Sequence, residues 1–170
     1  KSDAAGNDVI VRLVQAGETL GYRSYFANAH YAASAQALTG ARVCFIDRDA
    51  VAQLLERNPS IGHQFLRRMA NDLEQSDVEQ LNMATLDVRT RLSHLLLTLK
   101  DRFSDVDDRG NIVLQLPLSR QDIASMLGTR PETIARTIKS LEKDGVADFQ
   151  GRTVIVEDLD LLLDEVEPGA

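Results

Sequence analysis

Residues 118–143 constrain the fold of this 170-residue chain most strongly, because their pattern predicts two short helices separated by a sharp turn. Ser119 is a good N-cap for the first helix, and Gly128 provides the backbone freedom that the turn needs. Pro131 suits the first turn of the second helix, where its missing N–H costs no hydrogen bond. Apolar residues recur at helical spacing in both helices, namely Ile123, Ala124, Leu127, Ile134, Ile138 and Leu141. The segment is therefore predicted to form a helix-turn-helix.

The outward face of the second predicted helix carries side chains that are suited to reading DNA bases. Steps of three and four residues place four of them on one side: Glu132, Thr133, Arg136 and Lys139. An arginine can donate two hydrogen bonds to guanine and a glutamate can accept one from cytosine, so we predict base contacts by Glu132, Thr133 and Arg136. Phosphate contacts are predicted for Ser119, Arg120, Thr129, Arg130, Lys139 and Arg152. The spacing alone leaves a second interpretation open, an ordinary helical hairpin with a solvated charged face.

Residues 146–156 favour the DNA-reading interpretation, because they predict a pair of β-strands directly after the second helix. Two β-prone runs flank Gln150-Gly151-Arg152, where Gly151 can adopt a positive φ angle. A strand pair in this position makes a winged helix. Arg152 at its tip would lie where a phosphate contact is useful.

From Ser119 to Gly145 the sequence resembles the C-terminal domain of the CRP/FNR family, bacterial relatives of the cyclic-AMP receptor protein. The runs SRQDIASMLG and ETIARTIKSLEKDG carry the resemblance. It implies an α+β chain: the C-terminal part of a cyclic-nucleotide-binding-type β-roll sensor at 1–58, a dimerisation helix at 59–86, and a winged helix-turn-helix DNA-binding domain at 87–170. It also implies a homodimer that reads an inverted-repeat, TTGA-like site in double-stranded DNA under control of the sensor, with RNA polymerase as a further partner.

The sensor part is predicted to contain short strands broken by Gly, Asn and Asp, at 9–14, 33–38 and 43–46. A complete roll of the family has further strands before Lys1, so we expect a chain trimmed at its N-terminus. Iron–sulfur cysteines of the FNR-like branch would also precede Lys1. An iron–sulfur or haem cofactor therefore stays an open question at this stage.

The residues that hold cyclic AMP in the nucleotide-binding members of the family are replaced here. The resemblance places a Gly-Glu pair for the ribose and an Arg-Ser pair for the phosphate within the stretch matching 17–35. In this chain Tyr22 follows Gly21, and Tyr31-Ala32 replace the Arg-Ser pair. A buried phosphate without a cation would be costly, so we expect cyclic AMP not to bind. The pattern is closer to the FNR-like branch.

The helix predicted at 59–86 carries an apolar stripe with polar interruptions. Its members, at mixed steps of three and four residues, are Ile61, Phe65, Met69, Leu73, Gln80 and Met83. We predict that this stripe pairs with its symmetry mate as a short parallel coiled coil. The alternative is a core helix of the monomer. A new helix is expected to begin after Asp87, with a hinge at 84–87.

The net charge of −7 limits the interaction with nucleic acid without excluding it. Residues 119–143 carry five cations and three anions, a local excess of two positive charges, so the rest of the chain carries −9. An acidic body with a small basic face should bind DNA with a strong salt response. Because no apolar run approaches the ~18 residues of a membrane span, we expect a cytoplasmic protein without a membrane partner.

Neither an enzyme nor a metal protein is indicated. The histidines, His30, His63 and His94, lack ligand spacing, and the single Cys44 lies in an apolar run that predicts a buried thiol. No Ser/His/Asp or Cys/His arrangement and no phosphate-binding glycine loop is recognisable. The alternative function kept beside a DNA-binding regulator is an effector-binding or dimerisation module without DNA activity.

Overall fold

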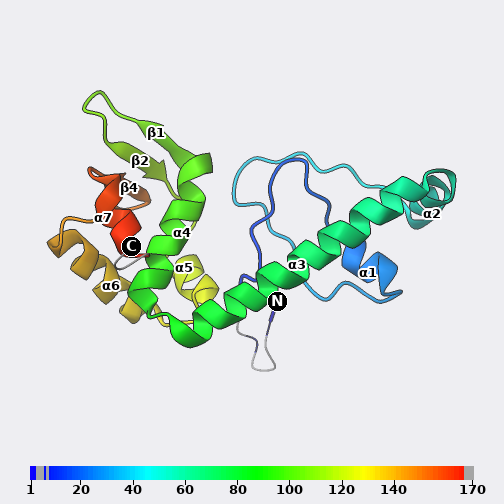
Figure 1. Ribbon diagram of the computed structural model, residues 1–170, viewed down its shortest axis with the longest axis horizontal. Coiled ribbons are helices and arrows are strands. Elements are labelled where there is room, and N and C mark those ends of the chain that lie inside the picture. The colour runs from blue at the N-terminus through cyan, green and yellow to red at the C-terminus, as the bar shows by residue number, and fades with distance from the viewer. Residues whose placement is uncertain (3–5, 7, 167–170) are drawn as a thin grey trace.

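A long helix, α3 (Pro59–Thr85), runs through the molecule and joins two parts of different character (Figure 1). The structure is a computed structural model that describes residues 1–2, 6 and 8–166. Pro59 starts α3 where its missing N–H costs nothing, and Leu86 ends it in an extended conformation. The helix agrees with the one predicted at 59–86.

The part after α3 is a winged helix-turn-helix domain, as predicted. Its elements are, in order, α4 (Val88–Phe103), β1 (Ser104–Val106), β2 (Ile112–Gln115), α5 (Arg120–Met126), α6 (Pro131–Lys143), β3 (Asp148–Gln150), β4 (Thr153–Val156) and α7 (Leu159–Asp164). The strands form one antiparallel sheet in the order β1-β2-β4-β3, with Leu114 opposite Val154. Strand β1 was not predicted, because its polar sequence reads as a loop.

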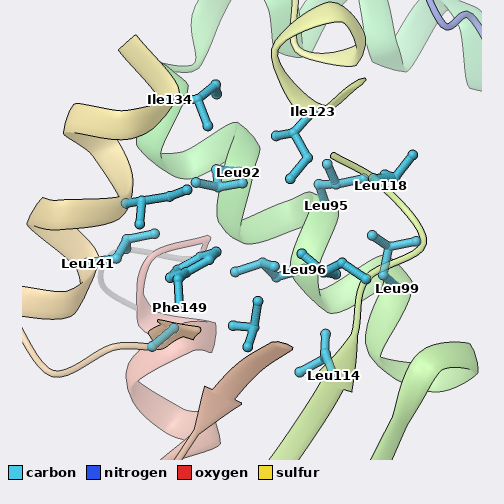
Figure 2. Close-up of a cluster of buried hydrophobic side chains, with 14 of the residues drawn as sticks. Leu92, Leu95, Leu96, Leu99, Leu114, Leu118, Ile123, Ile134, Leu141 and Phe149 are labelled. Atoms are coloured by element: carbon cyan, nitrogen blue, oxygen red, sulfur yellow. The ribbon is translucent and has the colours of Figure 1, made fainter. Parts of the chain in front are cut away.

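The core of this domain is a layer of leucines on α4 that the other elements cover (Figure 2). Leu92, Leu96 and Leu99 are completely buried among side chains from α5, α6, the sheet and α7. Burying one such side chain contributes about 1.5–3 kcal/mol. The buried face of α6, Ile134, Ile138 and Leu141, belongs to the same core, so α6 is held firmly on the domain.

The strands predicted at 9–14, 33–38 and 43–46 are not present in the structure. The described residues between 8 and 46 form irregular chain and one short helix, α1 (Tyr22–Phe26), before α2 (Arg48–Arg57) begins. A strand needs a neighbour to pair its backbone groups. The described residues before α2 form only an isolated bridge, between Ser2 and Asp8. The prediction of a buried Cys44 is also wrong, since Cys44 and its neighbours Val43 and Phe45 are exposed.

The part before α3 is attached to that helix through aromatic and charged contacts. Tyr22 is buried, and its ring lies 5.8 Å from that of Phe65 between centroids. The carboxylate of Asp72 on α3 accepts hydrogen bonds from the Tyr22 hydroxyl and, at 2.7 Å, from Arg23. Burial alone would raise the pKa of Asp72, but these hydrogen bonds hold it below its ordinary value.

No helix within residues 8–166 combines the length and the apolar character that crossing a bilayer requires.

Candidate nucleic-acid interface

Helix α5 begins with a capping box that fixes its first turn. The hydroxyl of Ser119 accepts from the backbone N–H of Asp122 at 3.1 Å, and the Asp122 carboxylate accepts from the backbone N–H of Ser119 at 2.7 Å. The Ser119 hydroxyl also donates to Asp122, so this predicted phosphate contact already has partners within the chain. Arg120 next to it is exposed.

The turn between α5 and α6 depends on Gly128. Its φ angle of +59° lies in the left-handed region that disfavours a side chain, and the N–H of Thr129 then bonds to the carbonyl of Ala124 at 3.0 Å. Ala124 is 1% exposed, and its small side chain lets the two helices approach closely. The turn thus has the role predicted for it.

Helix α6 presents one face to the core and the opposite face to solvent. Ile134 and Ile138 are at most 1% exposed, whereas Glu132, Arg136 and Lys139 are exposed and Thr133 is half-buried at the flank. Arg130 is the N-cap residue, extended and exposed, directly before Pro131. The structure therefore brings the three predicted base-contacting side chains together on the first two turns of one helix.

The wing is the hairpin of β3 and β4. Gln150 pairs with Thr153 across a two-residue turn in which Gly151 has a φ angle of +69°. Arg152 is exposed at this tip, and its carbonyl accepts from the N–H of Leu116 at 2.8 Å, which ties the wing to the segment before α5.

The exposed cations of α5, α6 and the wing are not neutralised by carboxylates of the described residues. No carboxylate within residues 8–166 lies within 4.0 Å of the side chains of Arg120, Arg130, Arg136, Lys139 or Arg152. The described ion pairs lie instead on α3 and its neighbours, at Lys100, and at Arg89. The basic charge on this surface is therefore available to an anionic partner.

The residues predicted for the dimer interface differ in exposure along α3. Phe65 contacts Tyr22 and Phe26 of its own chain, Ile61 and Met69 are half-buried, and the side chain of Met83 lies 3.7 Å from the place that a Cβ on Gly128 would occupy. Leu73 and Gln80 point outward, and Leu73 is 65% exposed. Leu66 and Leu81 share this outward face at 59% and 60% exposure. Leu73 follows Leu66, and Gln80 follows Leu73, at a step of seven positions, which is heptad spacing.

The junction between α3 and the winged helix-turn-helix domain is short and held by side chains. Asp87 caps α4 by accepting from the N–H of Thr90 at 2.8 Å, as predicted, and Arg91 donates to the carbonyl of Met83 at 3.1 Å. A contact that the sequence did not predict lies close by on α5. Ser125 accepts from the N–H of Ile10 at 3.1 Å and donates to the carbonyl of Asp8 at 2.8 Å. The domain is therefore held by both α3 and the N-terminal segment.

Tyr22 and Tyr31, two positions that the resemblance matches to cyclic-AMP contacts, both lie next to Gly21. The Tyr22 hydroxyl is bonded to Asp72, and the ring of Tyr31 lies 2.8 Å from where a Cβ on Gly21 would be. The described part of the chain contains no group of three or more side chains arranged for a metal ion.

Two family models match the chain, one on each side of the long helix. The model for a Crp-like helix-turn-helix domain matches residues 90–165, and the model for a cyclic nucleotide-binding domain matches residues 1–58. The second match agrees with the predicted sensor type, although the strands of a roll are not formed in the described residues.

Curated relatives match over most of this chain. The anaerobic regulatory protein of Pasteurella multocida is 27% identical over 94% of the chain, and the transcriptional activator protein FnrL of Cereibacter sphaeroides is 28% identical over 76%. The cAMP-activated global transcriptional regulator CRP of Salmonella typhimurium is 28% identical over 91%. These matches span 58%, 54% and 73% of the relatives' own lengths.

Solved structures have the same fold. FixK2 from Bradyrhizobium japonicum aligns with a TM-score of 0.61 at 21% identity over 70% of this chain and 58% of that chain. A protein from Thermus thermophilus, described as a transcriptional regulator of the CRP/FNR family, aligns with a TM-score of 0.58 at 20% identity over 65% and 56%. With both family models on one chain and relatives of both the FNR and CRP kinds, this protein belongs to the CRP/FNR family of transcription regulators.

Proposed function

We propose that this protein is a sequence-specific DNA-binding transcription regulator that acts as a homodimer. The observation that carries the proposal is the geometry of α6: its apolar face is buried in the core, and Glu132, Arg136 and Lys139 face solvent without a described ion-pair partner. A helix held this firmly, with unpaired polar side chains on its first turns, suits insertion into a major groove. Members of the family are regulators rather than enzymes, in line with the sequence prediction.

The proposed site is an inverted repeat of TTGA-like half-sites. Arg136 donates two hydrogen bonds to the guanine, Glu132 accepts from a cytosine, and Thr133 contacts a base at the flank. Pro131 has no side-chain donor, so a guanine contact from that position is absent. Arg120, Thr129, Arg130, Lys139 and Arg152 fix the domain on the phosphates, and Ser119 caps the helix that carries Arg120.

The proposed dimer forms through the outward face of α3. Its leucines would lose most of their exposed surface in a parallel pair of helices, which favours association. Leu73 and Gln80 of the predicted stripe lie on that face, together with Leu66 and Leu81. Phe65 contributes indirectly, by packing Tyr22 and Phe26 against the same helix.

A signal other than cyclic AMP is proposed to control the regulator, acting on the part before α3. By the resemblance, Tyr22 and Tyr31-Ala32 stand where the ribose and phosphate contacts would be, and none of these side chains carries a positive charge. RNA polymerase is the further proposed partner, and transcription from a promoter that carries the site would show whether the bound dimer activates or represses it.

Fluorescence anisotropy with a duplex that carries two inverted TTGA half-sites tests this function. We expect specific binding that survives excess unrelated duplex and weakens steeply as salt is raised. The alternative, an effector-binding or dimerisation module without DNA activity, predicts no difference between this duplex and a scrambled one.

A further inference from the structure

Arg89, in the first turn of α4, forms side-chain hydrogen bonds to residues of both α6 and the end of α7. Its guanidinium donates to both carboxylate oxygens of Glu165, at 2.6 and 2.5 Å. It also donates to the hydroxyl of Ser140 at 2.7 Å and to the carboxylate of Asp144 at 2.5 Å. We call this group, Arg89 with Ser140, Asp144 and Glu165, the Arg89 clamp.

The clamp joins three elements that are distant in sequence. Ser140 lies in the last turns of α6, Asp144 is the C-cap of that helix, and Glu165 is the C-cap of α7. Helix α7 itself is anchored in the core by Leu162, which is completely buried. A guanidinium fork fixes its partners in direction as well as distance, which an ammonium group cannot do.

The position of Arg89 is unfavourable on local grounds. A cation in the first turn of α4 faces the positive end of that helix dipole, where acidic residues are preferred. The same cation lies at the negative end of α6, where it is stabilising. The hydrogen bonds to Glu165 and then to Asp144 raise the pKa of Arg89, and the hydrogen bond from Arg89 lowers the pKa of Asp144. A residue that breaks a local rule and is compensated by tertiary contacts marks a position with a specific role.

We propose that Arg89 is a positioning residue for DNA reading. It fixes the C-terminal end of α6 to the start of α4. A movement at the hinge 84–87 is therefore passed on to α6 in full. Arg89 is two residues beyond the Asp87 cap at which α4 begins. The inference rests on the proposed function, because it concerns how accurately α6 meets the bases.

The test compares Arg89→Ala, Arg89→Lys and Glu165→Gln with the wild type on specific and scrambled duplexes over a range of salt. Arg89→Ala should weaken specific binding about tenfold, leave scrambled binding unchanged and leave the salt slope unchanged. Arg89→Lys should recover only part of the loss, since a lysine cannot hold both carboxylate oxygens of Glu165.

Glu165→Gln separates positioning from simple electrostatics. Removing a negative charge should by itself strengthen DNA binding, whereas loss of the clamp should weaken specific binding. Glu157→Gln is the matched control, because Glu157 is exposed in the same acidic region and has no described contact with Arg89. The proposal is overturned if Glu165→Gln behaves like Glu157→Gln, or if Arg89→Ala lowers the salt slope by about one, as a phosphate contact would.

Amide hydrogen exchange, measured without DNA, tests whether the Arg89 clamp holds α6 and α7 in place. This test does not depend on the proposed function. Arg89→Ala should speed exchange in α7 and the last turn of α6 and leave the turn at Gly128 unchanged. Failure of wild type to prefer the specific duplex would count against the proposed function alone. Unchanged exchange in Arg89→Ala would overturn the clamp whatever the DNA result.

Discussion

Single basic side chains on the DNA-facing surface should contribute to binding without reading sequence. Lys139→Ala and Arg120→Ala each remove one exposed cation that has no described ion-pair partner. Each change should weaken binding to all duplexes alike and lower the slope of log K against log salt by about one. Titrations at several salt concentrations measure this. A loss confined to the specific duplex would show that the side chain reads a base.

Residues that bond to nearby backbone were predictable from the sequence, and residues that bond to distant parts of the chain were not. Asp87 and Gly128 act on backbone groups a few residues away, so residue type and spacing are sufficient to assign them. Ser125 bonds to backbone 115 and 117 residues earlier, and Arg89 bonds to Glu165, 76 residues later. Only the tertiary fold brings such groups together, and nothing in their local sequence marks them.

At the scale of elements, the outward face of α3 is expected to hold the dimer together. Leu73→Asp would place a charge in a seam that excludes water, so the protein should become monomeric. Gln64→Asp is the matched control, because residue 64 lies on the opposite side of the helix from residue 73. Sedimentation velocity of both variants distinguishes them. A dimer that persists in Leu73→Asp would place the interface elsewhere.

The attachment of the N-terminal segment to α3 should depend on acid through Asp72. Because its folded-state pKa lies below the ordinary 3.8, the ionised carboxylate contributes stability above that value. This contribution should be lost as the pH falls below 3.8 through the lower folded-state pKa. Near-UV circular dichroism of the tyrosines should show the step in wild type and not in Asp72→Asn. An identical acid profile in both would show that Asp72 does not hold the segment.

Apart from β1, the elements after residue 58 were predictable, because the residues that specify each of them lie within or next to the element itself. Helices α4 and α5 have their own side-chain caps, α3 and α6 each begin at a proline, and the wing has its own turn. The strands predicted before residue 47 depend on neighbours for every backbone hydrogen bond, so β-prone sequence alone did not determine them. Cys44 is exposed for the same reason, since no neighbouring strand in the described residues covers it.

For the molecule as a whole, cyclic AMP should have no effect on DNA binding. The Tyr22 hydroxyl is hydrogen-bonded to Asp72, and the sequence has Tyr31-Ala32 where the resemblance expects an Arg-Ser pair. Isothermal calorimetry with cyclic AMP should therefore give no saturable heat, and anisotropy titrations with and without the nucleotide should superimpose. Micromolar binding accompanied by a change in DNA affinity would contradict this.

The central claim is that α6 reads sequence through Arg136, and selection from a pool of random duplexes tests it most directly. Wild type should recover an inverted repeat of TTGA-like half-sites with a strong preference for the guanine. Arg136→Ala should lose about 1–3 kcal/mol on that site and recover sequences in which the guanine preference is relaxed. Recovery of the same motif with the same guanine preference by both proteins would contradict the claim that this helix is the reader.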